Sequence, residues 1–218
     1  MKKLQVLVLS FALCGITVCG QNKPYTAKKI AGKPNMGKMM PDLSSWPEAS
    51  RMAAKEIMKK YGKPDAIGPE MLGWKDKGPW KMIHIDKQET KHSFPIEHTD
   101  MMKTTIRYEV PIGKFDDLAR FDGSIIVDRT QGLMSARCDK EANNFLALNL
   151  ANDILTGKKS VEEARKAYGD IVKEKMNGGN PQYMQGLTFT QKGNGDPDIN
   201  TTGLTKEDVM KTAGLAKK

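Results

Sequence analysis

All three histidines of this 218-residue chain lie in one stretch, near carboxylates, as His84-Ile85-Asp86, His92 and Glu97-His98. Imidazole nitrogens and carboxylate oxygens are ligands that proteins use to bind zinc and similar metals. Because this stretch joins two predicted strands, facing strands could bring His84 and Asp86 near His98. The sequence therefore presents His84, Asp86 and His98 as a candidate metal site, and a metal-dependent hydrolase as an alternative function.

The spacing of these histidines matches no established metal-binding motif. If Trp80, Met82 and His84 share one face of a strand, the simpler interpretation is a histidine at the edge of a sheet. No cofactor motif occurs elsewhere in the chain. We therefore expect no cofactor, with zinc or calcium as the alternatives.

Calcium is an alternative ligand because four residues match positions 1, 3, 5 and 12 of an EF-hand loop: Asp196, Asp198, Asn200 and Glu207. Oxygen ligands at this spacing can converge on Ca²⁺. The frame is incomplete, because Thr201 stands where the turn needs glycine. A calcium-stabilised domain is thus a second alternative, and a polar loop before a short helix is the simpler interpretation.

Cys138 directly precedes a predicted helix, where the helix dipole could lower the pKa of a thiol and make it nucleophilic. Met134 and Ala136 share its strand face, however, and the sequence places no histidine beside it. A buried, unreactive thiol is the preferred interpretation. Because Gly-x-Ser-x-Gly and His-Glu-x-x-His are also absent, we predict no catalytic residue.

Three main helices are expected to support these residues. The first follows a capping box at 45–48 and ends at Gly62. Residues 139–156 carry apolar side chains around much of the helix circumference, which predicts the most buried helix. A second capping box at 160–163 begins a helix that ends near 177–179.

The strands are predicted from alternation of apolar and polar residues. They are expected around 73–74, 80–85 and 104–110, as a hairpin of 124–129 with 133–138, and near 186–190, with a short helix beginning at Phe115. This order separates strands from helices instead of alternating them. It predicts an α+β fold in a single domain at 45–190, with a mostly antiparallel sheet of about four or five strands.

The N-terminus has the layout of a bacterial signal peptide over residues 1–20: two lysines, a mostly apolar run at 6–18, and small residues before Gln21. The apolar run is too short to cross a bilayer, so no transmembrane segment is expected after processing. Residues 21–44 read as a flexible tether and residues 191–218 as a polar tail.

Two routes of processing remain open. Cleavage before Gln21 would release a freely exported protein, whereas Cys19 could be lipidated as in a lipoprotein, although Val18 departs from the usual small residue. Cleavage before Gln21 also leaves Cys138 as the single cysteine of the mature chain, which excludes an internal disulfide. Either route predicts a periplasmic or extracellular protein, free or anchored to the membrane.

The mature chain is basic, because loss of Lys2 and Lys3 leaves 33 basic against 26 acidic residues, a charge of +7. The basic residues are scattered along the chain, so an exported protein of this kind is not expected to bind nucleic acid. Its expected partners are another envelope protein, a glycan or an anionic membrane surface. The primary hypothesis is accordingly a non-enzymatic binding or structural protein of the cell envelope.

Overall fold

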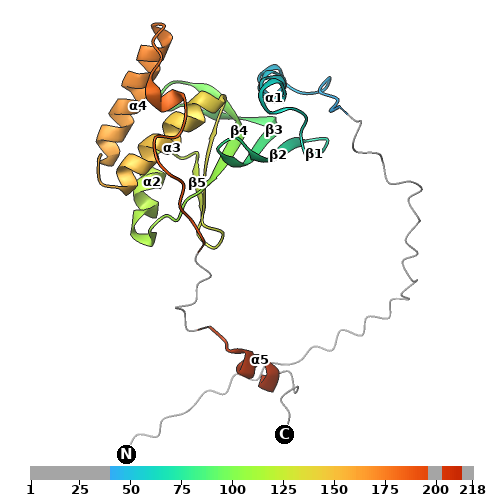
Figure 1. Ribbon diagram of the computed structural model, residues 1–218, viewed down its shortest axis with the longest axis vertical. Coiled ribbons are helices and arrows are strands. Elements are labelled where there is room, and N and C mark those ends of the chain that lie inside the picture. The colour runs from blue at the N-terminus through green and yellow to red at the C-terminus, as the bar shows by residue number, and fades with distance from the viewer. Residues whose placement is uncertain (1–39, 196–202, 213–218) are drawn as a thin grey trace, which may run out of the picture. The chain divides into compact units, whose positions relative to one another are not determined.

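The computed structural model describes residues 40–195 and 203–212. Within residues 40–195, a six-stranded antiparallel sheet packs against helices (Figure 1). The α+β prediction is confirmed, with slightly more strands than expected. The leader and Cys19 lie outside the described residues. Within those residues, no helix has the length and apolar character needed to cross a bilayer.

The sheet follows the order β1-β2-β3-β4-β6-β5, so most neighbouring strands are also neighbours in sequence. The strands are β1 (Ala66–Ile67), β2 (Met71–Lys77), β3 (Trp80–His92), β4 (His98–Arg107), β5 (Ile125–Asp128) and β6 (Leu133–Cys138). The predicted hairpin of 124–129 with 133–138 is confirmed as the pair β5 and β6. Both edge strands are short, which limits the backbone that is open to pairing with another chain.

The helices are α1 (Glu48–Tyr61), α2 (Phe115–Phe121), α3 (Glu141–Leu155), α4 (Val161–Met176) and α5 (Lys206–Thr212). Figure 1 shows α2, α3 and α4 grouped together. Twelve of the fifteen residues of α3 are buried, which confirms the prediction that it is the most buried helix. Its Leu146 and Leu150 belong to the same core as Trp74 and Ile83 of the sheet.

The pairing of β3 with β4 shifts part-way along the two strands. Ile85 lies opposite Met102 and Thr90 lies opposite Asp100, so five positions on β3 span the same length as two positions on β4. The surplus of three residues is odd, and side chains alternate between faces with a period of two. Beyond this irregularity, even-numbered residues of β3 therefore face the side that Ile85 faces before it.

Two local predictions at the start of the domain are wrong. The capping box at 45–48 does not form, because Pro47 is the N-cap of α1 and makes no side-chain cap. Leu43, assigned to the tether, is buried in the core together with Trp46. The packing of these two apolar side chains makes Leu43 part of the folded domain.

The segment at 186–190, predicted as a strand, is not one. Its backbone hydrogen bonds go to a side chain of α3: the Asn149 amide donates to the Gly186 carbonyl at 2.8 Å, and its oxygen accepts from Thr188 N at 2.8 Å. A buried asparagine thus replaces a neighbouring strand as the partner of this backbone.

The second capping box is present at the start of α4, where Ser160 Oγ accepts from Glu163 N and the Glu163 carboxylate accepts from Ser160 N. We expect Ser160→Ala to lower the free energy of unfolding by about 1 kcal/mol, because a backbone N–H of the first turn loses its acceptor. Urea denaturation measures this change. Ser45→Ala, at the box that does not form, should change stability by less than about 0.5 kcal/mol, and an equal loss in both variants would contradict this account of the caps.

Candidate metal centre

His92, His98 and Asp100 come together at the end of the β3–β4 hairpin. Each of these side chains offers one ligand atom, and the three atoms lie within 4.8 Å of one another. His92 is paired directly with His98 across the two strands, and Asp100 lies two residues further along β4 on the same face. Among the described residues, this is the single group of three that could hold a metal ion.

Asp100 is the centre of the cluster and is only 1% exposed. Its Oδ2 accepts a hydrogen bond from the Ser124 hydroxyl and lies 3.3 Å from His92 Nδ1. Its Oδ1 lies 3.1 Å from His98 Nε2 but accepts no hydrogen bond of good geometry. A carboxylate oxygen has more than one acceptor site, so Oδ1 can serve a further ligand beside its contact with His98.

The second nitrogen of each imidazole ring faces an oxygen atom, and that of His98 lies within hydrogen-bond distance of it. His98 Nδ1 lies 2.8 Å from the Ile96 carbonyl oxygen, so an N–H there can donate while Nε2 faces Asp100. His92 Nε2 lies 3.7 Å from Asp122 Oδ1 while Nδ1 faces Asp100. Histidines that ligate metals are commonly oriented in this way, by a carbonyl or carboxylate on the second nitrogen.

Cys138 adjoins the same cluster, because its Sγ lies 3.3 Å from His98 Nε2. The sequence placed no histidine beside this thiol, and the structure shows that His98 is its neighbour. Burial raises the pKa of the Cys138 thiol, although the hydrogen bond with His98 opposes this shift. The thiol therefore stays protonated near neutral pH and is not an activated nucleophile.

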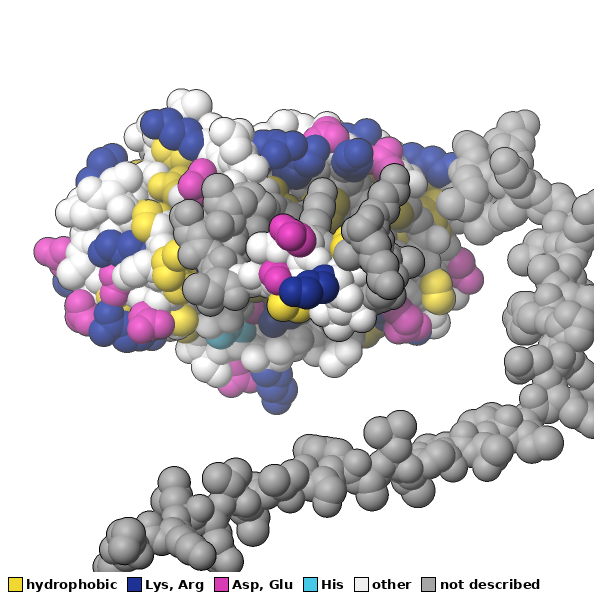
Figure 2. All heavy atoms as spheres, turned by 90° about the horizontal axis from the view of Figure 1, so that it is seen from below, with side chains coloured by type: hydrophobic (Ala, Val, Ile, Leu, Met, Phe, Trp, Pro, Cys, Tyr) yellow, Lys and Arg dark blue, Asp and Glu magenta, His cyan; other side chains and the backbone are white. Residues whose placement is uncertain are grey.

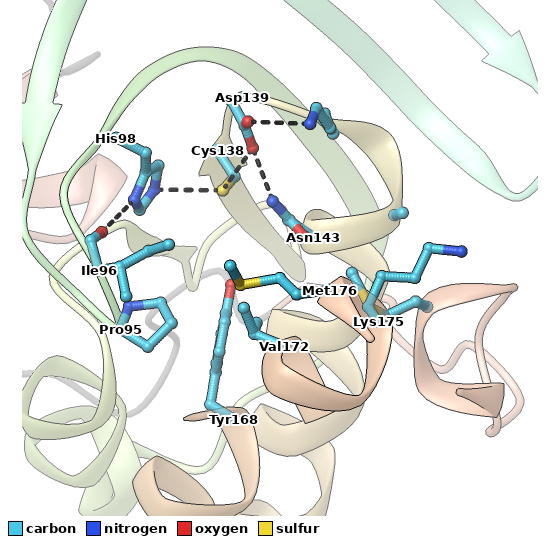
Figure 3. A pocket seen from close by; sticks show the side chains of 13 residues that line it. Pro95, Ile96, His98, Cys138, Asp139, Asn143, Tyr168, Val172, Lys175 and Met176 are labelled. Atoms are coloured by element: carbon cyan, nitrogen blue, oxygen red, sulfur yellow. Dashed lines mark hydrogen bonds and ion pairs between the residues drawn. The ribbon is translucent and has the colours of Figure 1, made fainter. Parts of the chain in front are cut away.

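A cavity of about 320 Å³ opens beside His98 and Cys138 (Figure 3). It is bounded by the hairpin loop, the start of α3, the end of α4 and the short helix at Gln182–Met184. Figure 3 shows His98, Cys138, Asp139 and Asn143 at one end, and mainly hydrophobic side chains at the other. Of the three residues of the candidate metal centre, His98 lines this space, which can admit a small molecule.

Without metal, the cluster is held by ion pairs. The Asp100 carboxylate and then the Cys138 thiol, both close to Nε2 of His98, raise the pKa of His98 to about 11. For Asp100, burial acts to raise the pKa, but the contact with His98 and the hydrogen bond from Ser124 outweigh it, and the pKa is lowered. His98 is therefore a cation and Asp100 an anion at neutral pH, and a metal ion must displace the His98 proton.

Zinc binding is accordingly expected to strengthen with pH. His98 stays protonated across pH 6.5 to 8, so zinc must displace a proton from it throughout this range. Each increase of one pH unit lowers the proton concentration tenfold, and the Kd for zinc should therefore fall at least about tenfold per pH unit. Competition against a chromophoric chelator, corrected for the protonation of the chelator, measures this slope. A Kd that does not change over this range would contradict a ligand role for His98.

The structure does not bring His84 and Asp86 to His98. His84 is paired with Lys103, whereas His98 is paired with His92, well beyond the register shift. His84 also lies on the sheet face opposite to that of Ile85, while His92 and His98 lie on the same face as Ile85. Of the three residues predicted as metal ligands, only His98 belongs to the observed cluster.

Sequence reasoning missed His92 and Asp100 as the partners of His98. Regular alternation would place His92 on the same face as His84, and only the shift in register reverses this. The available signal was that His92 and His98 bracket Phe94-Pro95-Ile96, a turn long enough to close a hairpin. A hairpin closed there would have paired the two histidines.

Three of the four residues of the predicted calcium site, Asp196, Asp198 and Asn200, lie outside the described residues. Glu207 is exposed in the first turn of α5. The cap expected for that helix is present, with Thr205 Oγ accepting from Asp208 N at 3.1 Å.

Comparison of the chain with protein families, curated proteins and solved structures gave no match.

Proposed function

We propose that this chain is an exported protein of the cell envelope whose α+β domain binds a transition-metal ion of the zinc class through His92, His98 and Asp100. The observation that carries this proposal is the convergence of two imidazoles on one buried carboxylate, whose Oδ1 accepts no hydrogen bond of good geometry. Nitrogen ligands favour zinc and its neighbours over calcium or magnesium, which prefer oxygen.

Export is supported by the leader at residues 1–20, and the same leader keeps Cys19 as a site for a lipid anchor. Intact mass of the protein from its native host distinguishes the two routes. A chain beginning at Gln21 supports free export, and diacylglycerol on Cys19 supports the anchor. A chain that retains Met1 in the cell interior would contradict both.

The domain is proposed to act by binding, with an envelope protein, a glycan or an anionic membrane surface as partner. On the face shown in Figure 2, Lys and Arg side chains are interspersed with Asp and Glu. On this face, such mixing does not form the continuous basic stripe that nucleic acid binding uses. A modest net positive charge still favours anionic surfaces.

A metal-dependent hydrolase is the second candidate function, and the cavity beside His98 favours it. Three protein ligands leave a fourth position on a tetrahedral metal, and catalytic zinc sites keep that position for water or substrate. A metal there would lower the pKa of the bound water. Hydrolysis of chromogenic esters by the zinc-loaded protein, lost on chelation, would favour this candidate over simple binding.

Metal binding is tested directly by titrating Zn²⁺ into the mature protein after treatment with a chelator. We expect one equivalent to bind and the melting temperature to rise, because a ligand that binds only the folded state stabilises it. Calcium should produce neither effect at the same concentration. A protein that binds no zinc and melts unchanged would show that the cluster is an ion-pair network of purely structural role.

A further inference from the structure

We propose that the cavity beside the metal centre binds the carboxylate of a medium-chain fatty acid, with the head group on the metal and the alkyl chain along the α4 side. This inference rests on the proposed metal site and names its ligand. It follows from the division of the cavity into a polar end and an apolar end (Figure 3).

The apolar end is made by α4 and the hairpin loop. Tyr168 and Val172 of α4 line the cavity together with Pro95. Ile96 and Met176 also line it, and they are exposed to 55% and 72%. Large hydrophobic side chains left in water at the mouth of a cavity are typical of a surface that an apolar ligand covers.

The polar end favours a negative head group. Lys140 and Lys175 line the cavity, and Asp139 is the single carboxylate among the lining residues. The Asp139 carboxylate is already engaged, since it accepts from the Asn143 amide at 2.6 Å and lies 3.8 Å from Lys140 Nζ. A divalent metal beside His98 adds further positive charge, so a carboxylate complements this end better than a neutral or cationic group.

The size of the cavity limits the ligand. A volume of about 320 Å³ lies at the lower end of the range for ligand pockets, which favours a chain of about eight carbons over a complete membrane lipid. Each methylene that the apolar end buries should raise affinity about fourfold. Octanoate is therefore the probe, and hexanoate is its shorter comparison.

The experiment is calorimetric titration of octanoate into the zinc-loaded mature chain. We expect octanoate to bind at least tenfold more tightly than hexanoate, and 1-octanol and octylamine to bind weakly. Chelation of the zinc should reduce octanoate affinity at least tenfold. Equal affinity with and without zinc, or for octanol and octanoate, would overturn the assignment of the head group.

Two methionine variants test the location. Met176→Glu places a charge at the mouth of the cavity and should weaken octanoate binding at least tenfold while zinc still binds. Met52→Glu alters a similarly exposed methionine on α1 and should have no effect. If zinc binds and octanoate does not, the ligand proposal fails alone; if zinc does not bind, the proposed function fails as well.

Discussion

His98→Ala is expected to weaken zinc binding at least about 100-fold, more than the loss of a residue that only orients a ligand. His98 Nε2 lies 3.1 Å from Asp100 Oδ1, and its Nδ1 is held by the Ile96 carbonyl, so the ring is positioned before metal arrives. Alanine removes one of three protein ligands together with that positioning. Chelator competition at pH 7.5 measures the change, and His92→Ala should lose affinity similarly.

His84→Ala is the matched control, because His84 lies on β3 with His92 but on the opposite face of the sheet. Its zinc affinity should equal that of the unaltered protein. Circular dichroism and the melting temperature in the absence of zinc establish that each variant is folded. Comparable losses of zinc affinity in His84→Ala and His98→Ala would contradict this location of the metal. Unchanged zinc affinity in His98→Ala would show that His98 is not a ligand.

Glu141→Ala is expected to lower the free energy of unfolding by about 3 kcal/mol. Glu141 is buried at the start of α3, and its Oε1 accepts from Trp80 Nε1 at 2.7 Å and from the Tyr61 hydroxyl. Its Oε2 pairs with Lys60. Alanine would leave the Trp80 N–H buried without an acceptor and would remove the polar contacts that join α1 and β3 to α3. Urea denaturation followed by tryptophan fluorescence measures the loss.

Two further variants define the origin of this effect. Glu56→Ala removes an exposed carboxylate from α1 and should change stability by less than about 0.5 kcal/mol. Glu141→Gln keeps an oxygen acceptor for Trp80 and should lose less stability than Glu141→Ala. A loss as small as that of Glu56→Ala would show that these hydrogen bonds are exchanged for water at no cost.

Local features of the chain were predictable from sequence wherever the deciding interactions lie within a few residues. The capping box at Ser160 joins residues three apart, and the apolar pattern of 139–156 reports burial of α3 directly. The hairpin of β5 and β6 is likewise set by a short turn. The α+β class followed from the order of these elements.

The candidate metal centre was decided by tertiary structure. Cys138 and His98 are 40 residues apart and meet only when β6 joins the sheet, and Ser124 reaches Asp100 from the segment after α2. His92 faces His98 because β3 carries three more residues than β4 through the register shift. A strand pattern has a period of two, so an odd surplus reverses the face of every following side chain, and the alternation of residues along β3 alone does not reveal this reversal.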